Sequence, residues 1–339
     1  MSIHHEVLGQ PGRDNALWVT IDAGHSTSRL LFDCGEGCLG SGTKSFGDIT
    51  TLDELFFSHL HMDHVGGFDS FFRCNFSRNT RPNRIWGPPD TARILQHRFR
   101  GFLWNLYDEL EGTWFVSDIG TETVRTTRFE LHEGFETPHD AGDVPFTTTI
   151  LEHEAYSVET MPLDHRTPSM AYLVREPARW NIDPDRLAAS GLRPGAWMQR
   201  LKADAPPDAT VEVGGTTYLL EILRRDLLIE TPGESVAYLS DFRLDDETLP
   251  KVVSWLSGCG TLVCESQYRH ADAEIATRHR HMTTRLTATL AREAGVGNLV
   301  LIHLSDRYPE PEWLEMLDEA REVFPETSFP SHWKIDSAG

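Results

Sequence analysis

The chain has 339 residues, of which 39% are hydrophobic and 24% charged, enough for one large domain or two smaller ones. It contains no apolar run long enough to span a bilayer, and residues 1–12 lack the basic start and apolar core of a secretion signal, so we expect a soluble, cytoplasmic protein. A formal net charge of −21 disfavours nonspecific attraction to phosphate backbones. The five scattered cysteines lack metal-knuckle spacing, and we expect reduced core residues.

Short β-rich runs alternate with helical periodicity along the chain. Asp90 can cap a helix with apolar positions from Ile94 to Leu106, and Thr283 can cap another that ends before Gly295. A third helix is expected over 312–324, and polar, proline-containing loops over 138–145 and 205–207. This order predicts a single α/β domain spanning 1–339, with two sheets between helical layers. The expected strands are 17–21, 29–32, 55–57, 84–86, 236–239, 261–264 and 299–304.

Charge is distributed unevenly along the chain. Between residues 109 and 159, twelve acidic residues accompany two basic ones, a pattern typical of a solvated face. The balance reverses over 175–204, where six basic residues stand against four acidic ones, with Trp180 and Trp197 between them. This segment could touch an anionic substrate, or it could be a solvated insertion whose arginines lie along apolar surface.

The densest group of metal-ligand residues follows the apolar stretch 52–57. His59, His61, Asp63 and His64 place three imidazoles and a carboxylate within six consecutive positions. Two histidines at i and i+2 of an extended segment point to the same side, and Asp63 and His64 can face a second ion after the turn. Imidazole and carboxylate without thiolate favour an open zinc, manganese or iron site, and open coordination positions favour hydrolysis. The alternative is an ordinary polar loop after a strand.

Further ligands are needed because each ion takes about four. Three candidates stand beside strand-like runs: His165 after 161–164, Asp241 after 236–240, and His303 within the apolar run 299–305. Each alone is more often a structural residue. Together with the cluster at 59–64, they supply the number of ligands that a two-ion site requires.

Several motifs in this order resemble the metallo-β-lactamase superfamily and, within it, the ribonuclease Z family. The resemblance rests on four short segments, on the cluster at 59–64 and on two single acidic residues. The segments are Asp33-Cys34-Gly35-Glu36-Gly37, 162–165, 281–283 and 303–308, and the single residues are Asp241 and Glu265. It implies a four-layer αββα sandwich of two mixed β-sheets flanked by helices. The chain differs at Met62, Phe242 and Met282, where the family usually has glycine, threonine and serine.

The resemblance also implies roles for individual residues. His59, His61 and His165 would hold one divalent ion, Asp63, His64 and His303 would hold the other, and Asp241 would bridge both. Glu265 and His281 would form a pair near the scissile phosphate. The ions are expected to be Zn²⁺, with Mn²⁺ or Fe²⁺ as alternatives. The segment 175–205 would correspond to the family's tRNA-gripping arm, and the protein would be a homodimer.

These roles predict a phosphodiesterase, resembling the endoribonuclease that trims the 3′ side of precursor tRNA. Two ions about 3.5–4 Å apart can lower the pKa of a shared water towards neutrality. Asp63 could accept the proton of that water. His281, oriented by Glu265, could stabilise the phosphoryl charge or protonate the leaving group. His279 is an alternative candidate for the role of His281. The alternatives are a small-molecule hydrolase acting on a cyclic phosphodiester, thioester or lactone, and a non-catalytic metal-binding protein.

Overall fold

The computed structural model of the protein describes residues 2–39, 44–105, 109–203, 205, 206 and 208–335. These fall into two compact units, a core unit of Met1–Arg175 with Glu234–Gly339 and an inserted unit of Glu176–Gly233. None of the helices in these ranges has the length and apolar character needed to cross a bilayer.

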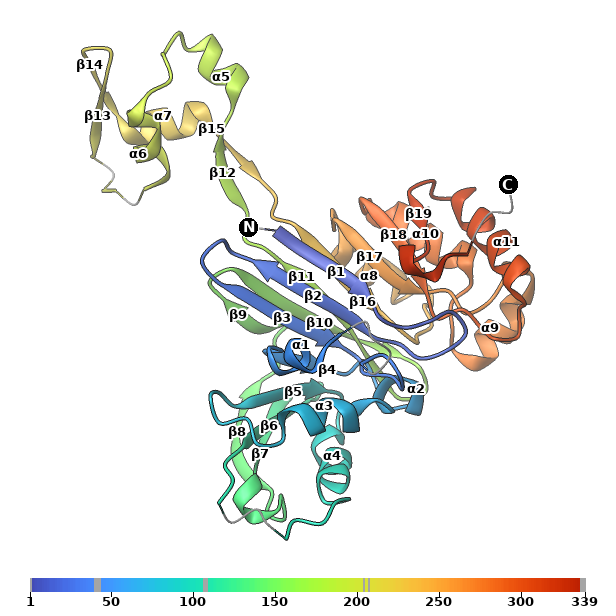
Figure 1. Cartoon of the computed structure of the whole chain (residues 1–339). Coiled ribbons are helices and arrows are strands. Elements are labelled where there is room, and N and C mark those ends of the chain that lie inside the picture. The colour runs from blue at the N-terminus through green and yellow to red at the C-terminus, as the bar shows by residue number, and fades with distance from the viewer. Residues whose placement is uncertain (1, 40–43, 106–108, 204, 207, 336–339) are drawn as a thin grey trace. The chain divides into compact units, whose positions relative to one another are not determined.

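The first sheet of the core unit contains eight strands among the described residues, and they lie side by side in chain order (Figure 1). Its central pairs β3–β4, β4–β5 and β5–β6 are parallel, and the outer pairs are antiparallel, so the sheet is mixed. The strands are β1 Ser2–Val7, β2 Leu17–Asp22, β3 Thr27–Phe32, β4 Glu54–Phe56, β5 Asn83–Gly87, β6 Thr113–Ile119, β7 Thr123–Glu130 and β8 His139–Pro145.

The second sheet of the core unit has the order β19-β18-β17-β16-β11-β10-β9. Strands β16 to β19 run parallel, and β9, β10 and β11 continue the sheet in antiparallel pairs, so this sheet is also mixed. The strands are β9 Thr149–His153, β10 Tyr156–Asp164, β11 Pro168–Arg175, β16 Ser235–Leu239, β17 Thr261–Glu265, β18 Asn298–Ile302 and β19 Thr327–Ser328.

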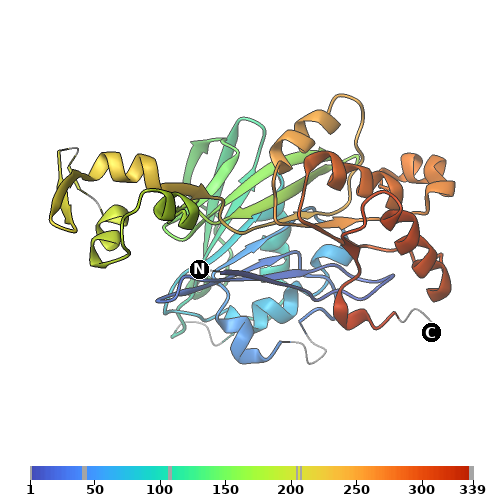
Figure 2. The same cartoon turned by 90° about the horizontal axis from the view of Figure 1, so that it is seen from above.

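Side chains that alternate along the strands divide the core into layers. Leu30 and Phe32 of β3 face the second sheet and pack in one cluster with its Tyr172 and Tyr238. Leu31, between them, faces the helices α1 (Phe46–Thr50), α3 (Phe68–Asn75) and α4 (Thr91–Phe99). Helices α8 (Leu249–Leu256), α10 (Thr284–Ala294) and α11 (Glu310–Arg321) cover the outer face of the second sheet. Figure 2 shows the blue helices and the orange and red helices on opposite sides of the strands, which confirms the predicted four-layer sandwich.

The helices of the core unit are short, and most lie on the outer faces of the sheets. The α-helices are α1 Phe46–Thr50, α2 Met62–Val65, α3 Phe68–Asn75, α4 Thr91–Phe99, α8 Leu249–Leu256, α9 Ala273–His279, α10 Thr284–Ala294 and α11 Glu310–Arg321. Single 3₁₀ turns occur at Leu131–Glu133, His270–Asp272 and Ser331–Trp333.

The inserted unit has its own small apolar cluster, in which Trp197, Leu201 and Leu223 are buried. Two antiparallel strand pairs, β12–β15 and β13–β14, frame its helices. The elements are β12 Arg179–Ile182, α5 Pro184–Ala189, a 3₁₀ turn at Ala196–Met198, α6 Gln199–Lys202, β13 Thr210–Val213, β14 Thr216–Leu219, α7 Leu220–Leu227 and β15 Leu228–Thr231.

All seven predicted strands are confirmed, with ends that differ by one or two residues. The Thr283 cap is also confirmed, since its hydroxyl accepts the Leu286 N–H and Gly295 ends α10 with a left-handed backbone. The loop predicted over 138–145 is wrong, because this exposed polar segment forms the edge strand β8. An edge strand tolerates proline at its end and needs no apolar side chains.

The helix predicted after Asp90 is shorter than expected. Helix α4 ends at Phe99, two residues before Gly101, and Phe102 and Leu103 are exposed beyond it, while Leu106 lies outside the described residues. Asp90 occupies the N-cap position, but its left-handed backbone turns the carboxylate away from the helix N–H groups and towards Arg93. The predicted side-chain cap is therefore wrong.

Glu54 at the start of β4 predicts a pH-dependent stability. Burial raises the pKa of its carboxyl to about 7, although the hydrogen bond that Trp86 donates to the carboxylate lowers the pKa. The folded pKa exceeds the unfolded one, so stability falls as pH rises from the unfolded pKa to the folded pKa. Glu54→Gln should raise the free energy of unfolding by on the order of 2–3 kcal/mol at about pH 8 and leave it unchanged near pH 4. Urea unfolding at both pH values measures this, and an equal effect at both would contradict it.

Candidate metal centre

The predicted site residues meet at one end of the core unit, beyond the ends of several strands. His59 and His61 follow β4, and His165, Asp241 and His303 follow β10, β16 and β18 respectively. These strands point the same way within their sheets, so the residues after them gather at one edge. The structure therefore brings together side chains that are far apart in the sequence.

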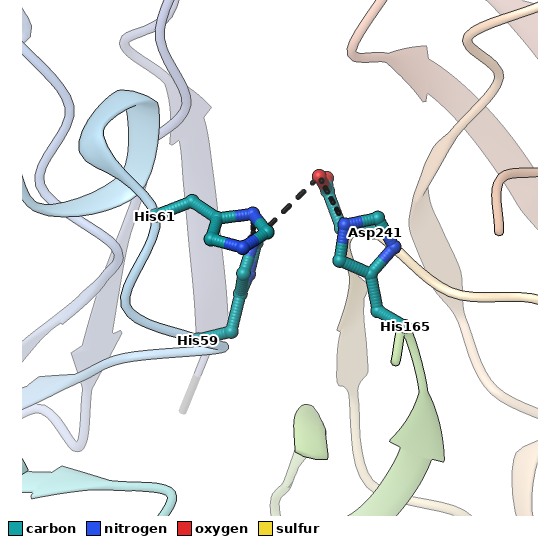
Figure 3. A group of neighbouring side chains, drawn as sticks. All are labelled: His59, His61, His165 and Asp241. Carbon is teal, nitrogen blue, oxygen red and sulfur yellow. Dashed lines mark hydrogen bonds and ion pairs between the residues drawn. The ribbon is translucent and has the colours of Figure 1, made fainter. Parts of the chain in front are cut away.

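The first group contains His59, His61, His165 and Asp241, whose ligand atoms all lie within 4.8 Å of one another. Nε2 of His59 lies 2.9 Å from Nδ1 of His61. Oδ2 of Asp241 lies 3.7 Å from Nε2 of His59 and 3.7 Å from Nε2 of His165. In Figure 3 the rings of His59 and His61 and the side chains of His165 and Asp241 point towards a common space.

The second group contains Asp63, His64, His303 and the same Asp241. Oδ1 of Asp241 lies 3.4 Å from Nε2 of His64 and 3.2 Å from Nε2 of His303. Oδ2 of Asp63 lies 3.3 Å from each of these two nitrogens. The two oxygens of Asp241 thus face different sets of imidazoles.

Most of these separations fit the donors of a tetrahedral ion. A zinc ion bound at about 2.0–2.1 Å places neighbouring ligand atoms about 3.3–3.4 Å apart. The imidazole–carboxylate separations of 3.2 to 3.7 Å lie close to that value. Neutral imidazole and carboxylate also suit zinc, manganese or iron. The residues present therefore fit the divalent ions that the fold implies.

Burial and neighbouring charges shift the pKa values of several candidate ligands. Burial lowers the pKa of His59 well below its ordinary value, and the His64 ring adds to this effect, so His59 is neutral and able to bind metal. Burial opposes charge on His303, but the carboxylates of Asp241 and Asp63 raise its pKa to about 9. Burial also opposes ionisation of Asp241, yet His303 and His64 hold its pKa well below the usual range. Metal binding would displace the proton from His303, so affinity should increase with pH.

Residues behind the ligands fix the orientation of the rings, and these contacts were not predicted. The fully buried carboxylate of Asp33 accepts a hydrogen bond from Nδ1 of His64 at 2.6 Å, and also from Ser58 and Tyr238. This bond leaves Nε2 of His64 facing Asp241. Nδ1 of His165 likewise lies 3.0 Å from the carbonyl oxygen of Arg280. A carboxylate directly after the apolar end of β3 was the signal for Asp33.

Glu265 and His281 form the predicted pair. Oε2 of Glu265 lies 3.0 Å from Nδ1 of His281, and its other oxygen accepts the Phe242 N–H at 2.6 Å. Ligand atoms of this pair lie within 4.8 Å of each other and of His303. The ring of His281 is 4.7 Å from that of His165, whereas the exposed His279 packs near Tyr268 instead. His281, rather than His279, therefore borders the metal-ligand groups.

Met62 separates two ligand candidates in sequence and is exposed. Its side chain is 84% exposed, and the neighbouring Asp63 side chain is 42% exposed, whereas His59, His64 and Asp241 are buried. The turn 61–63 is therefore the accessible edge of the site.

Comparisons of the sequence and the fold with known proteins identify relatives of this chain. The family model described as Anti-Pycsar protein Apyc1 matches residues 14–165. Ribonuclease Z of Deinococcus radiodurans is 47% identical over 96% of this chain and 97% of that protein. Two solved structures share the fold, and each match covers 97% of this chain and 96% of the other protein's chain. They are the metallo-β-lactamase fold protein YhfI of Bacillus subtilis, with a TM-score of 0.55 and 15% identity, and human tRNase Z, short form, with 0.54 and 17%.

The identity to ribonuclease Z extends over nearly the whole chain, and the sandwich of two mixed sheets with His/Asp groups at its edge matches the fold of these structures. The chain belongs to the ribonuclease Z family of metal-dependent endoribonucleases with the metallo-β-lactamase fold.

Proposed function

We propose that this enzyme holds two divalent ions, most simply Zn²⁺, and cleaves precursor tRNA on its 3′ side. His59, His61 and His165 would hold one ion, Asp63, His64 and His303 the other, and Asp241 would contact both. The observation that carries this proposal is the division of the Asp241 oxygens between two sets of imidazoles. The names of the relatives, ribonuclease Z and tRNase Z, support tRNA as the substrate.

The residues around the ions would divide the chemistry between them. Bound ions would supply an activated water and neutralise phosphate charge. The Asp63 side chain is 42% exposed at the accessible edge, and its Oδ2 lies 3.3 Å from Nε2 of His64 and from Nε2 of His303, so it is placed to accept a proton from the attacking water. His281, oriented by Glu265, is placed to protonate the leaving oxygen or stabilise charge on the phosphoryl group.

The inserted unit supports a polyanionic substrate. A cavity of about 720 Å³ in it is lined by four basic side chains, one acidic side chain, Glu221, and the 54% exposed Trp180. We propose that this unit, which contains residues 176–205 of the predicted segment 175–205, grips tRNA through phosphate contacts and base stacking. The basic lining residues are Arg179, Lys202, Arg224 and Arg225.

We further propose a homodimer in the cytoplasm. The dimer is an expectation from the family resemblance in the sequence, and the free, mostly buried cysteines suit a reducing compartment. Light scattering of the purified protein tests the dimer directly.

Three substrates assayed in parallel with metal-loaded enzyme test the function. We expect cleavage of a precursor tRNA carrying a 3′ trailer and of an aryl phosphodiester, and no hydrolysis of a thioester. The net charge of −21 favours small substrates, so this comparison is decisive. Cleavage of the aryl diester without tRNA cleavage would select a small-molecule phosphodiesterase. Activity on the thioester alone would overturn the phosphodiesterase assignment.

Substitutions at Asp63 and His281 should separate metal binding from proton transfer. Asp63→Ala should abolish hydrolysis, because it removes both a ligand and the base. His281→Ala should lower kcat by about 10²–10⁴-fold while the metal content stays that of the wild type. Rate measurements and elemental analysis of the same preparations check both results. His279→Ala is the matched control and should change neither quantity, whereas loss of metal in His281→Ala would contradict the assignment.

Substitutions in the inserted unit should affect tRNA and spare small substrates. Trp180→Ala combined with Lys202→Ala removes one stacking platform and one cation, and should raise KM for precursor tRNA by at least about tenfold. Hydrolysis of the aryl phosphodiester should be unchanged. Phe46→Ala combined with Arg292→Ala removes an exposed aromatic side chain and an exposed cation from the core unit as a control. Equal effects of both pairs on tRNA would argue against the proposed grip.

A further inference from the structure

Asn15 lies against the turn that carries the metal-ligand candidates. Its backbone N–H donates to the carbonyl oxygen of Asp63 at 3.0 Å, and its own carbonyl accepts the Gly35 N–H at 3.0 Å. A Cβ at Gly35 would lie 2.4 Å from the Asp63 carbonyl oxygen and 2.8 Å from the Asn15 nitrogen. The three segments can approach this closely only because residue 35 is glycine. The backbone therefore holds Asn15 in a fixed position beside Asp63.

The side chain of Asn15 is directed at the second ligand group. It is 4% exposed, and its Nδ2 lies 3.3 Å from Nε2 of His64. Within the described ranges, this ring nitrogen is the hydrogen-bond partner that the structure gives the Asn15 amide. The same nitrogen lies 3.3 Å from Oδ2 of Asp63 and 3.4 Å from Oδ1 of Asp241. The amide thus reaches the place where the second ion would bind.

A bound ion would compete with Asn15 for His64. Nδ1 of His64 lies 2.6 Å from Oδ2 of Asp33, so Nε2 is the ring nitrogen left to bind an ion in this group. A lone pair given to a metal ion cannot also accept the amide N–H. A buried N–H left without a hydrogen-bond partner is unfavourable. The amide therefore needs an acceptor that arrives beside Asp63 and His64.

We infer that Asn15 is a further catalytic residue, whose side-chain amide donates a hydrogen bond to an oxygen of the scissile phosphate. The inference rests on the proposed function, because it takes the substrate to be a phosphodiester. A neutral donor suits this position, since it stabilises negative charge on phosphorus-bound oxygens without repelling a cation from Asp63, His64 and His303. Fixed by its backbone contacts, the amide would need no rearrangement when the phosphate binds.

Binding of inorganic phosphate to the zinc-loaded protein tests this role apart from turnover. Asn15→Ala should weaken phosphate binding about tenfold in calorimetry, and Asn15→Asp should weaken it further because the added carboxylate repels the anion. Zinc content should equal that of the wild type in both variants. In the same preparations, kcat for the aryl phosphodiester should fall by about 10²–10³-fold with little change in KM.

Asn75→Ala provides the matched control for loss of a buried amide. Asn75 is fully buried in α3 and donates to backbone carbonyls of Phe71 and Ile49, away from the ligand groups. This variant should lower the melting temperature and leave phosphate affinity unchanged. Unchanged phosphate affinity in Asn15→Ala, or weaker binding explained by lost zinc, would overturn the inference. A wild type that cleaves the aryl diester but not tRNA would refute the proposed substrate and leave the test of Asn15 valid.

Discussion

The carboxylate of Asp241 is the constraint on which the site depends. It is 3% exposed, and its two oxygens face four imidazoles contributed by both halves of the sandwich. A buried charge is tolerated only when it is paired or coordinates metal. The position of this one side chain therefore couples the turn after β4 to the ends of β10, β16 and β18. Displacing it would disturb both ligand groups together.

The backbone at three strand ends adopts an energetically unfavourable conformation. Asp33, Asp241 and His303 follow β3, β16 and β18, and each has a left-handed backbone, with φ of 56°, 51° and 56°. A non-glycine residue in this region costs of order 1–3 kcal/mol, and such residues persist where surrounding contacts determine their conformation. Here those contacts are the hydrogen bonds and ion pairs of the ligand groups. The left-handed backbone at these three strand ends helps to direct their side chains towards one place.

Local patterns in the sequence predicted the strands and the positions of the candidate ligands. The continuous apolar run Leu30-Leu31-Phe32, for example, fits a strand that is buried on both faces. Contacts between distant segments could not be predicted in this way. Asp33 meets His64 across 31 positions, and Asn15 meets it across 49, and neither pair has a spacing that reveals the contact. Edge strand β8 was missed for a related reason, because its pairing with β7 needs no apolar side chain of its own.

The central claim is that Asp241 joins two metal ions, and anomalous diffraction at the zinc edge tests it most directly. Crystals of the zinc-loaded protein should show two anomalous peaks that both contact Asp241. One peak should lie among His59, His61 and His165, and the other among Asp63, His64 and His303. A single peak, or two peaks that do not share Asp241, would contradict this account of the site.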